Sequence, residues 1–492
     1  MSLSPLLFII LIPIIGALFS ATGVMPRRWA TIASGLNLIL VLVLWAVYPA
    51  GQGEWAFTSK LPVMPALDIN FSLGADRLSL IMLLLSTIVT FAAVLVSPAR
   101  MEKGEGMFYA CILFISAGAI GAFASTDVFF FYMFHELALI PTFLLIGIWG
   151  SGDRQAAAWR ITVYLALGSF ILLIGLLGLY FITPEPVRTF DMRKLQEMGG
   201  IIPPVGWVYA TLLVGFGILI SLFPFHSWAP QAYASAPAPA AMMHAGVLKK
   251  FGLYGMLRLT VPIFGDSVEW VTHLLLILLV GNILYIGLVT IAQRKLDWML
   301  GYSSVMHMGY IFLGIAGLNV LSLSGASILM LAHGLSIAAL FALAGEIRSR
   351  TGTLEFSHLG GLAKQFPGMA FLFGLAAMAS IGLPGFANFA GEVLVFFGAF
   401  AAGSSAEATR LAGFNFYQIV TVCSLWGVVI SAVYMLRGYR NVFFGDALGK
   451  APTGSDLSFV TRSAVTLLIL ALLLVGFFPG LVTGGLVQSL IP

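Results

Sequence analysis

The sequence predicts an all-α polytopic membrane protein with about 14 transmembrane helices. Hydrophobic residues make up 60% of the 492 positions and charged residues only 9%, whereas about a quarter of an ordinary soluble domain is charged. Apolar windows near 20 residues, long enough for a hydrocarbon core of about 30 Å, recur along the whole chain. This composition excludes a soluble globular class. The small, dispersed net charge of +4 also argues against a nucleic-acid partner and leaves the lipid bilayer as the expected surroundings.

The windows place the helices in chain order. The opening apolar run has no positively charged region before it and is longer than a signal-peptide core, so it is predicted to remain as an uncleaved first helix. Cys111 and Cys423 lie far apart inside apolar runs, which predicts neither a disulfide nor a cysteine-based metal site. The fourteen spans are expected at residues 4–23, 29–48, 79–97, 106–124, 127–148, 160–182, 205–235, 240–263, 269–291, 299–317, 323–346, 367–400, 414–436 and 461–485.

Basic residues in the loops predict the orientation. Alternating the loops between two sides places fifteen lysines and arginines on one face, among them Arg100, Lys103 and Lys450, and six on the other, among them Arg410. Cytoplasmic loops carry the excess of lysine and arginine in membrane proteins. The first face is therefore expected to be cytoplasmic and both termini external, in a bacterial-type inner membrane.

Two spans contain helix breaks. Four prolines interrupt residues 205–235 and the residues just after them, and the Leu383-Pro384-Gly385 stretch interrupts residues 367–400. The breaks fall in spans seven and twelve, and an odd offset of five makes corresponding helices run in opposite directions. This pattern predicts two inverted five-helix repeats, as in secondary transporters. The expected units are residues 1–98 with helices 1–3, 99–265 with helices 4–8, 266–445 with helices 9–13, and 446–492 with helix 14.

Ionisable residues inside the spans are the main functional signal, because charges at membrane depth are costly and usually functional. Histidine, carboxylate and desolvated lysine can exchange protons near neutral pH. Each also has a structural explanation: a histidine can simply bond a neighbouring helix, and a charge can belong to a static ion pair. The candidates are Glu136, Lys249, Lys250, Arg258 and Glu392, together with His135, His226, His244, His307 and His333.

The position within each span refines the expectations for three of these. Arg258 lies near the external end of its span, where extension of the side chain to the lipid headgroups is expected. Lys249 and Lys250 are adjacent and point about 100° apart on a helix, so they cannot face the same partner. Phosphate loops, dinucleotide-binding glycine motifs and nucleophile elbows are lacking in the sequence. Catalysis on an organic substrate by this chain alone is not predicted.

Long motifs in a fixed order resemble the antiporter-like membrane subunits of respiratory complex I, the proton-pumping NADH:quinone oxidoreductase, and most closely its chain M, or chain 4, type. The resemblance covers nearly the whole chain. It rests on "GADRLSL" (74–80), "FYMFHELALIP" (131–141), "FPFHSWAPQAYASAP" (223–237), "AGVLKKFGLYGMLR" (245–258), "GYSSVMHMGY" (301–310), "LAHGLSIAALF" (331–341), "GLPGFANFAGE" (382–392) and "SAVYMLRGYRNVFFG" (431–445).

The resemblance implies roles for matching positions. Glu136 corresponds to the family's coupling glutamate, Lys250 to its central lysine and Glu392 to its terminal glutamate, while His307 and His333 match histidines of the hydrophilic axis.

The chain also departs from the family pattern. The lysine that the family carries in span seven would fall near Leu219 and is absent. The extra Lys249 is expected to replace it as the partner of Glu136, with a contribution from His135 or His226. The family's Asp-x-Lys order also appears reversed, as Lys295 and Asp297, a swap that leaves the local charge unchanged.

The resemblance implies a proton-translocating subunit of NADH:quinone oxidoreductase that couples quinone reduction elsewhere in the complex to pumping. A proton would be taken up near His226, load Lys250 and pass along His307 and His333 to Glu392. No cofactor is expected in this chain. Flavin, iron–sulfur clusters and quinone are expected in partner subunits, which would include antiporter-like neighbours. The alternatives are a subunit of a multisubunit Na⁺/H⁺ antiporter or membrane-bound hydrogenase, and a non-pumping scaffold.

Overall fold

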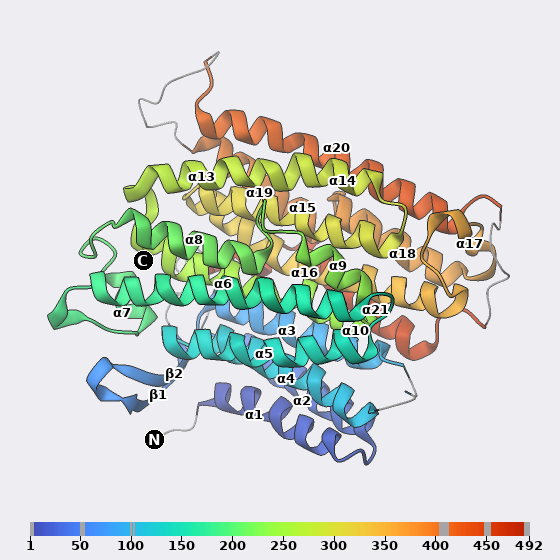
Figure 1. The fold of residues 1–492 in the computed structure, drawn as a ribbon, viewed down its shortest axis with the longest axis horizontal. Helices are drawn as coiled ribbons and strands as arrows, with labels where there is room; N and C mark the ends of the chain where they lie inside the picture. Colours follow the sequence, from blue (N-terminus) through green and yellow to red (C-terminus); the bar gives the residue numbers. More distant parts are fainter. Residues whose placement is uncertain are drawn as a thin grey trace.

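The computed structural model describes residues 4–49, 55–98, 101, 104–402, 413–446 and 454–486. Arg100, Lys103, Arg410 and Lys450, four of the basic residues used to predict the orientation, lie outside the described residues, as do both chain ends. The described chain forms one bundle of roughly parallel helices (Figure 1).

Ten helical segments of the described chain are long and apolar enough to cross a membrane, which confirms the polytopic class. They are α2 (Pro26–Val47), α3 (Arg77–Val96), α4 (Glu105–Ala124), α5 (Val128–Trp149), α6 (Arg154–Ile182), α13 with α14 (Glu269–Ala292), α15 (Leu296–Ala316), α16 (Val320–Thr351), α20 (Phe416–Phe443) and α21 (Phe459–Phe477). Four shorter apolar helices are α1 (Pro5–Ala21), α8 (Gly206–Ile220), α18 (Pro367–Ile381) and α19 (Ala387–Ala401).

The remaining helices are short pieces at breaks and in loops. They are α7 (Met192–Glu197), α9 (Trp228–Ser235), α10 (Ala238–Met243), α11 (Lys250–Gly255), α12 (Val261–Phe264), α17 (Leu362–Gln365) and α22 (Gly480–Thr483). π-helical turns are η3 (His244–Leu248), η4 (Met256–Thr260) and η6 (Gly281–Tyr285), the last of which joins α13 (Glu269–Val280) to α14 (Ile286–Ala292). Short 3₁₀ turns are η1 (Pro65–Leu67), η2 (Glu185–Val187), η5 (Gly265–Val268) and η7 (Phe356–His358).

Several long helices begin at an aspartate. Asp76, Asp127 and Asp153 are the N-cap residues of α3, α5 and α6, and each side chain accepts a hydrogen bond from a backbone N–H of the first turn. Such a cap pairs one of the N–H groups that a helix start leaves without a partner. These three helix starts are therefore set by local sequence.

A β-hairpin departs from the all-α prediction. Strands β1 (Ala56–Met64) and β2 (Ile69–Ala75) pair antiparallel, with Lys60 opposite Ser72, and protrude from one end of the bundle (Figure 1). The connection contains Pro65, and Asp68 closes it in the left-handed conformation. This turn chemistry favours a hairpin over a helix, and the search for long apolar windows overlooked it.

Asp68 attaches the hairpin to the loop before α7. Its carboxylate accepts hydrogen bonds from Thr189 Oγ1 at 2.6 Å, Asn70 Nδ2 at 2.9 Å and Lys194 Nζ at 3.3 Å. Partial burial pushes the pKa of Asp68 up, but these bonds and the charge of Lys194 outweigh it and lower the pKa to about 2. The hairpin is thus held by an ionised carboxylate at ordinary pH.

The two predicted helix breaks are present. Residues 221–227 separate α8 from α9, and residues 382–386 separate α18 from α19. Each first half ends with a residue in the left-handed conformation, Ser221 in one case and Gly382 in the other. The breaks lie where proline and glycine chemistry predicts them.

A glycine pair brings the two halves of the chain together. Gly246 of η3 faces Gly334 of α16, and a Cβ atom added to Gly334 would lie 2.6 Å from the Gly246 carbonyl oxygen. Only glycine permits this approach of two backbones. The contact sets the distance between the lysines that follow Gly246 and the histidine that precedes Gly334.

Candidate functional site

Asn282 stabilises the break between α8 and α9. Its Oδ1 accepts a hydrogen bond from Phe223 N–H at 2.7 Å, and its Nδ2 donates to the carbonyls of Ser221 and Val305 at 3.1 and 3.0 Å. The side chain is fully buried in the π turn η6. Asn282 therefore satisfies backbone groups that the break would otherwise leave unpaired at membrane depth. Asn282 was not predicted from the sequence, because its side chain is not ionisable and the ionisable residues of the spans were the main signal.

His226 lies inside the same connection. It is half-buried, and its ring stacks on Phe223 with centroids 5.7 Å apart. Its Nδ1 has no hydrogen-bond partner among the described residues. The structure places His226 on the connection itself, at the start of α9.

Lys250 contacts the second half of the chain directly. Its buried Nζ donates a hydrogen bond to the Ala245 carbonyl at 2.7 Å and lies 2.9 Å from Nδ1 of His333 on α16. A charged ammonium group can only donate, so Nδ1 accepts and the proton of a neutral His333 ring sits on Nε2. That Nε2 has no partner among the described residues. Lys250 and His333 thus form a hydrogen-bonded pair between α11 and α16.

Lys249 points elsewhere, as its position next to Lys250 predicts. Its buried Nζ lies 3.4 Å from Ser304 Oγ of α15, 5.1 Å from the ring centre of Tyr233 and 5.9 Å from that of Trp228, both on α9. These contacts are a weak hydrogen bond and two cation–π contacts. The π turn η3 ends at the residue before Lys249, and such turns often occur at functional sites.

The predicted Lys249–Glu136 ion pair is not formed. In the part of the chain that the structure describes, the ion-pair partner of the Glu136 carboxylate is His135, whose Nδ1 lies 3.6 Å from Oε1. The His135 ring stacks on Phe251, with centroids 4.0 Å apart. The prediction was wrong because Lys249 faces α9 and α15, whereas Glu136 lies on the outer side of α5.

His244 is joined to the surroundings of Lys249 by a tyrosine. The Tyr233 hydroxyl lies 3.1 Å from Nδ1 of His244, and both side chains are buried. His244 is the first residue of the π turn that precedes the two lysines. Tyr233 therefore contacts both His244, in η3, and Lys249, which directly follows η3.

His307 bridges two backbone carbonyls. Its Nδ1 lies 2.8 Å from the oxygen of Ser303 in the same helix, and its Nε2 lies 2.9 Å from the oxygen of Ser380 near the end of α18. A neutral imidazole has a single N–H, so only the charged ring donates to both carbonyls. Ser380 is also at a helix C-terminus, where a cation is favoured. The ring centre lies 5.8 Å from that of His333.

Glu392 lies against the break between α18 and α19. The side chain is buried on α19, and its carboxylate is in contact with Gly382, where an added Cβ atom would collide with it. Asn388 lies one helical turn earlier on the same face, and neither its Oδ1 nor its Nδ2 has a hydrogen-bond partner among the described residues. The hydroxyl of buried Tyr310 is also without one in that part of the chain. Unpaired buried polar groups of this kind indicate bound water.

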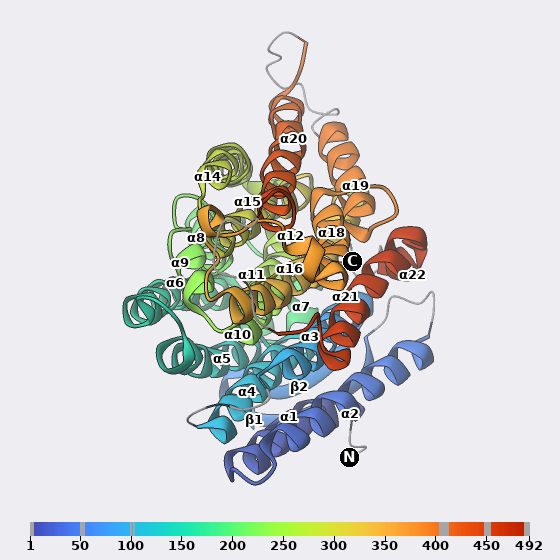
Figure 2. The ribbon, with the colours of Figure 1, turned by 90° about the vertical axis from the view of Figure 1, so that its right-hand side faces the viewer.

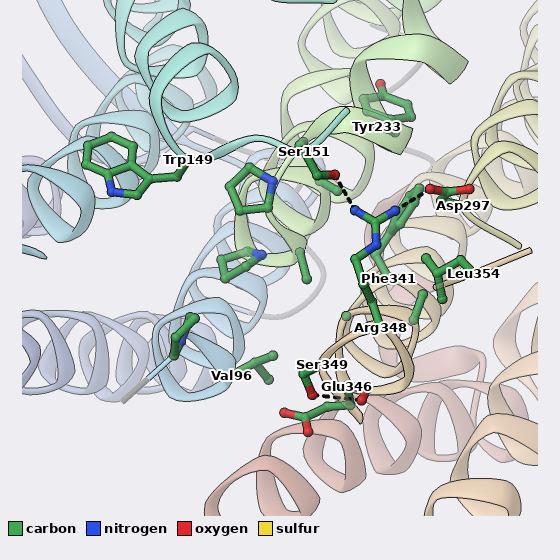
Figure 3. A pocket seen from close by; sticks show the side chains of 18 of the residues that line it. Val96, Trp149, Ser151, Tyr233, Asp297, Phe341, Glu346, Arg348, Ser349 and Leu354 are labelled. Carbon is green, nitrogen blue, oxygen red and sulfur yellow. Dashed lines mark hydrogen bonds and ion pairs between the residues drawn. The ribbon is translucent and has the colours of Figure 1, made fainter. Parts of the chain in front are cut away.

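A cavity opens at the other end of α9 (Figure 3). Its volume is about 460 Å³, and it is lined by the junction of α9 and α10, the end of α16 and the start of α15. Arg348 crosses its wall, pairing with the Asp297 carboxylate and donating to Ser151 Oγ. Tyr233, which contacts His244 and Lys249, also lines the cavity. His226 is not among the lining residues.

Asp297 has a larger structural role than its sequence position suggested, because it is buried and pairs with Arg348. The unchanged local charge predicted little effect from the reversed order of Lys295 and Asp297. In the structure, however, Lys295 is exposed and Asp297 is buried against Arg348. The swap therefore puts the carboxylate, and not the ammonium group, in the cavity wall.

Arg258 does not extend to the headgroups, so that prediction was wrong. Its guanidinium is buried and pairs with the buried Asp76 carboxylate, and it also donates to Ser79 Oγ at 3.2 Å. The rings of Trp55 and Tyr254 cover it at 4.7 and 4.9 Å. Asp76 is distant in the sequence, so the segment around Arg258 does not by itself indicate this pair.

The comparisons with known proteins agree with this architecture. Residues 125–411 match the family model described as NADH:quinone oxidoreductase/Mrp antiporter, TM. NAD(P)H-quinone oxidoreductase chain 4 1 of Picosynechococcus sp. is 35% identical over 485 residues, 97% of this chain and 88% of the relative. NAD(P)H-quinone oxidoreductase chain 4 of Gloeobacter violaceus is 32% identical over 486 residues, 96% and 90% of the two chains.

Solved structures are similar across nearly the full length. A chain of respiratory complex I from Thermus thermophilus with bound NADH matches with a TM-score of 0.87 and 28% identity, covering 98% of both chains. A chain of the Mrp complex from Dietzia sp. matches with a TM-score of 0.84 over 99% of this chain and 97% of the other, but at 20% identity it supports the fold alone. The resemblance to antiporter-like subunits of complex I is confirmed, and the chain belongs to the NADH:quinone oxidoreductase/Mrp antiporter transmembrane family.

Proposed function

We propose that this chain is a proton-translocating membrane subunit of an NADH:quinone oxidoreductase. The observation that carries the proposal is the contact between Lys250 and His333, which joins the two halves of the chain by one short hydrogen bond at membrane depth. Family membership supports the same function. Quinone reduction and the flavin and iron–sulfur chemistry belong to partner subunits in this proposal, and antiporter-like neighbours are among those partners.

Proton uptake is proposed through the cavity between α9, α15 and α16. Tyr233 lines this cavity and contacts both His244 and Lys249. A hydroxyl can accept one proton while it donates another. Tyr233 is therefore suited to pass protons from water in the cavity to His244. This route replaces the uptake near His226 that the sequence suggested, because the cavity lies at the opposite end of α9.

Transfer to the second half is proposed to begin at Lys250. Its Nζ bonds to Nδ1 of His333, and a proton donated there leaves from the unpaired Nε2 of the same ring. His307 is the next group. Its ring centre lies 5.8 Å from that of His333, a separation that a bridging water would span. Protonated His307 satisfies both Ser303 and Ser380, which makes it a resting place for the proton.

Release is proposed through Glu392. Water held by Asn388 and Tyr310 would carry the proton from His307 to the Glu392 carboxylate, at the break between α18 and α19. Movement or protonation of Glu136 would alter the proton affinity of the lysines electrostatically, with His135 in between. The seven groups in proposed roles are Glu136, His226, Lys249, Lys250, His307, His333 and Glu392, of which His226 supports the helix break.

The orientation and the repeat belong to the same proposal. Ten long helices, the shorter α1, the two broken helices (α8 with α9, and α18 with α19) and the segmented helix from α10 to α12 support fourteen spans arranged as two inverted repeats. With the basic loops in the cytoplasm, both termini are external.

Substitution of Lys250 tests the function. In the intact complex in membrane vesicles, Lys250→Met should abolish proton pumping coupled to quinone reduction because the ring of His333 loses its proton donor. Lys250→Arg keeps a cation but cannot release a proton, so it should also abolish pumping. Lys364→Met, an exposed lysine of α17, is the control and should pump normally.

The same experiment separates the alternatives. A non-pumping scaffold would tolerate both variants, and pumping retained in Lys250→Arg would show that Lys250 serves only as a fixed cation. Identification of the copurified subunits addresses the remaining alternative, because flavin and iron–sulfur subunits indicate the oxidoreductase and small antiporter subunits indicate an Na⁺/H⁺ antiporter.

A further inference from the structure

An apolar groove runs along the outside of the bundle between α2 and α21. Its volume is about 510 Å³, and every residue that lines it is apolar. Helix α3 lies between α2 and α21 (Figure 2) and contributes to the floor of the groove together with α16. Leu42 of α2 and Leu470, Leu474 and Phe477 of α21 form an exposed rim. In a membrane, the groove is therefore open to the acyl chains of the bilayer.

The floor of the groove is the back of the helix that carries His333. Leu331 and Leu335 of α16 line the groove and are buried. They lie two residues before and two residues after His333, and two residues turn a helix by about 200°. The groove and the contact between Lys250 and His333 therefore lie on opposite sides of α16.

Arg77 lies at one end of the groove. It is the first residue of α3, its guanidinium carbon lies 3.9 Å from the ring centre of Trp45, and its Nη2 donates a hydrogen bond to the Leu481 carbonyl. Trp45 is three residues beyond Leu42 in α2, and Leu481 is four residues beyond Phe477. Both contacts of Arg77 thus come about one helical turn beyond the rim of the groove.

The positive charge of Arg77 is not balanced by the described residues. Their ion pairs do not include Arg77, and its Nε has no hydrogen-bond partner among them. Tryptophan side chains at helix ends lie at the level of the lipid headgroups. A guanidinium has five N–H donors in a fork that matches a phosphate group. Arg77 next to Trp45 therefore complements a phosphate at headgroup level.

The size of the groove favours an acyl chain over a protein helix. Residues 467–477 of α21 cover about 15 Å, and a helix about 10 Å across fills roughly 1,200 Å³ over that length. The groove provides less than half of this volume. Its lining also offers no polar side chain, and an acyl chain needs none, because it has no backbone N–H or C=O groups to satisfy.

We propose that this groove binds one phospholipid, with an acyl chain between α2 and α21 and the phosphate on the Arg77 guanidinium. The lipid fills the space behind α16 and excludes water from the helix face opposite His333. The proposal goes beyond the proposed function and does not depend on it, because the lipid contacts none of the groups in the proposed proton route.

Electron cryo-microscopy of the intact complex in nanodiscs of dioleoylphosphatidylglycerol tests the site directly. The expected result is density for an acyl chain along the groove, joined to a phosphate in hydrogen-bond distance of Arg77. An empty groove, a protein segment in the groove, or a lipid whose phosphate lies away from Arg77 would overturn the proposal.

Lipid retention gives a second readout. The complex is loaded with deuterated dioleoylphosphatidylglycerol and washed in dodecyl maltoside, and the remaining labelled lipid is counted by mass spectrometry. Arg77→Gln should lose one lipid per complex about tenfold faster than the parent, since a charged hydrogen bond to the phosphate is lost. Ala471→Phe fills the groove and should retain one lipid fewer than the parent, although Arg77 is intact.

Arg188→Gln is the matched control. Arg188 also donates to backbone carbonyls, those of Thr183 and Phe181, and lies 5.5 Å from the ring centre of Tyr180, but it does not line the groove. This variant should retain the lipid as the parent does. Parental retention in either Arg77→Gln or Ala471→Phe would overturn the proposal, and so would an equal loss in Arg188→Gln and Arg77→Gln.

Discussion

Arg258 and Asp76 provide the sharpest test of how the bundle is held together. Both side chains are almost completely buried, and Asp76 also caps α3 by accepting the N–H of Ser79 at 2.9 Å. Replacing Arg258 by Met leaves a buried carboxylate with its cation removed. Breaking one partner of a buried ion pair costs about 3–5 kcal/mol. The folded-to-unfolded ratio should therefore fall about 10²- to 10⁴-fold.

The double variant Asp76→Asn with Arg258→Met isolates the cause. Asparagine keeps the helix cap, and neither charge remains, so the double variant should lie within about 2 kcal/mol of the parent and be more stable than Arg258→Met alone. The assay is equilibrium unfolding in mixed detergent micelles, followed by tryptophan fluorescence. As a control, Lys60→Met removes a largely exposed ion pair with Asp68 and should cost less than about 1 kcal/mol. A double variant less stable than the single variant would refute the reasoning.

Two further predictions concern other contacts. Asn282→Leu removes three hydrogen bonds at the break between α8 and α9 and leaves the Phe223 N–H unpaired. The free energy of unfolding in the same assay should therefore fall by about 3–5 kcal/mol. A fall of less than about 1 kcal/mol would show that the break does not depend on Asn282. Asp68, with its pKa lowered to about 2, stabilises the hairpin above pH 4, and this stabilisation is lost as the pH falls through 2. Pepsin should therefore cleave the hairpin of the parent faster at pH 2 than at pH 4. In Asp68→Asn, which loses the charged contact to Lys194, the two cleavage rates should differ only by the change in pepsin's own activity between these pH values.

The outcome for the lysines shows how far sequence reasoning extends. The 100° separation correctly predicted that Lys249 and Lys250 face different partners. It could not predict which partners, because the π turn before them shifts the register of the helix, and because the facing groups come from α9, α15 and α16. The choice of Glu136 as the partner of Lys249 failed for this reason.

The cavity and its ion pair were outside the reach of the sequence. Asp297 and Arg348 are 51 positions apart, and neither belongs to a recognisable spacing. Asn282 bonds to groups 61, 59 and 23 positions away. Such contacts exist only after the helices have packed, and the residue types alone do not distinguish them from ordinary polar side chains.

The membrane class, the positions of the two helix breaks and the ionisable residues of the spans followed from the sequence by itself. These properties depend on composition and on local backbone chemistry, above all the missing N–H of proline and the length of apolar windows. The hairpin at residues 56–75, the burial of Arg258 and the pairing of Lys250 with His333 were decided only by the tertiary structure. They depend on which helix faces lie together, here through the approach of Gly246 to Gly334, and no local pattern in the chain specifies that arrangement.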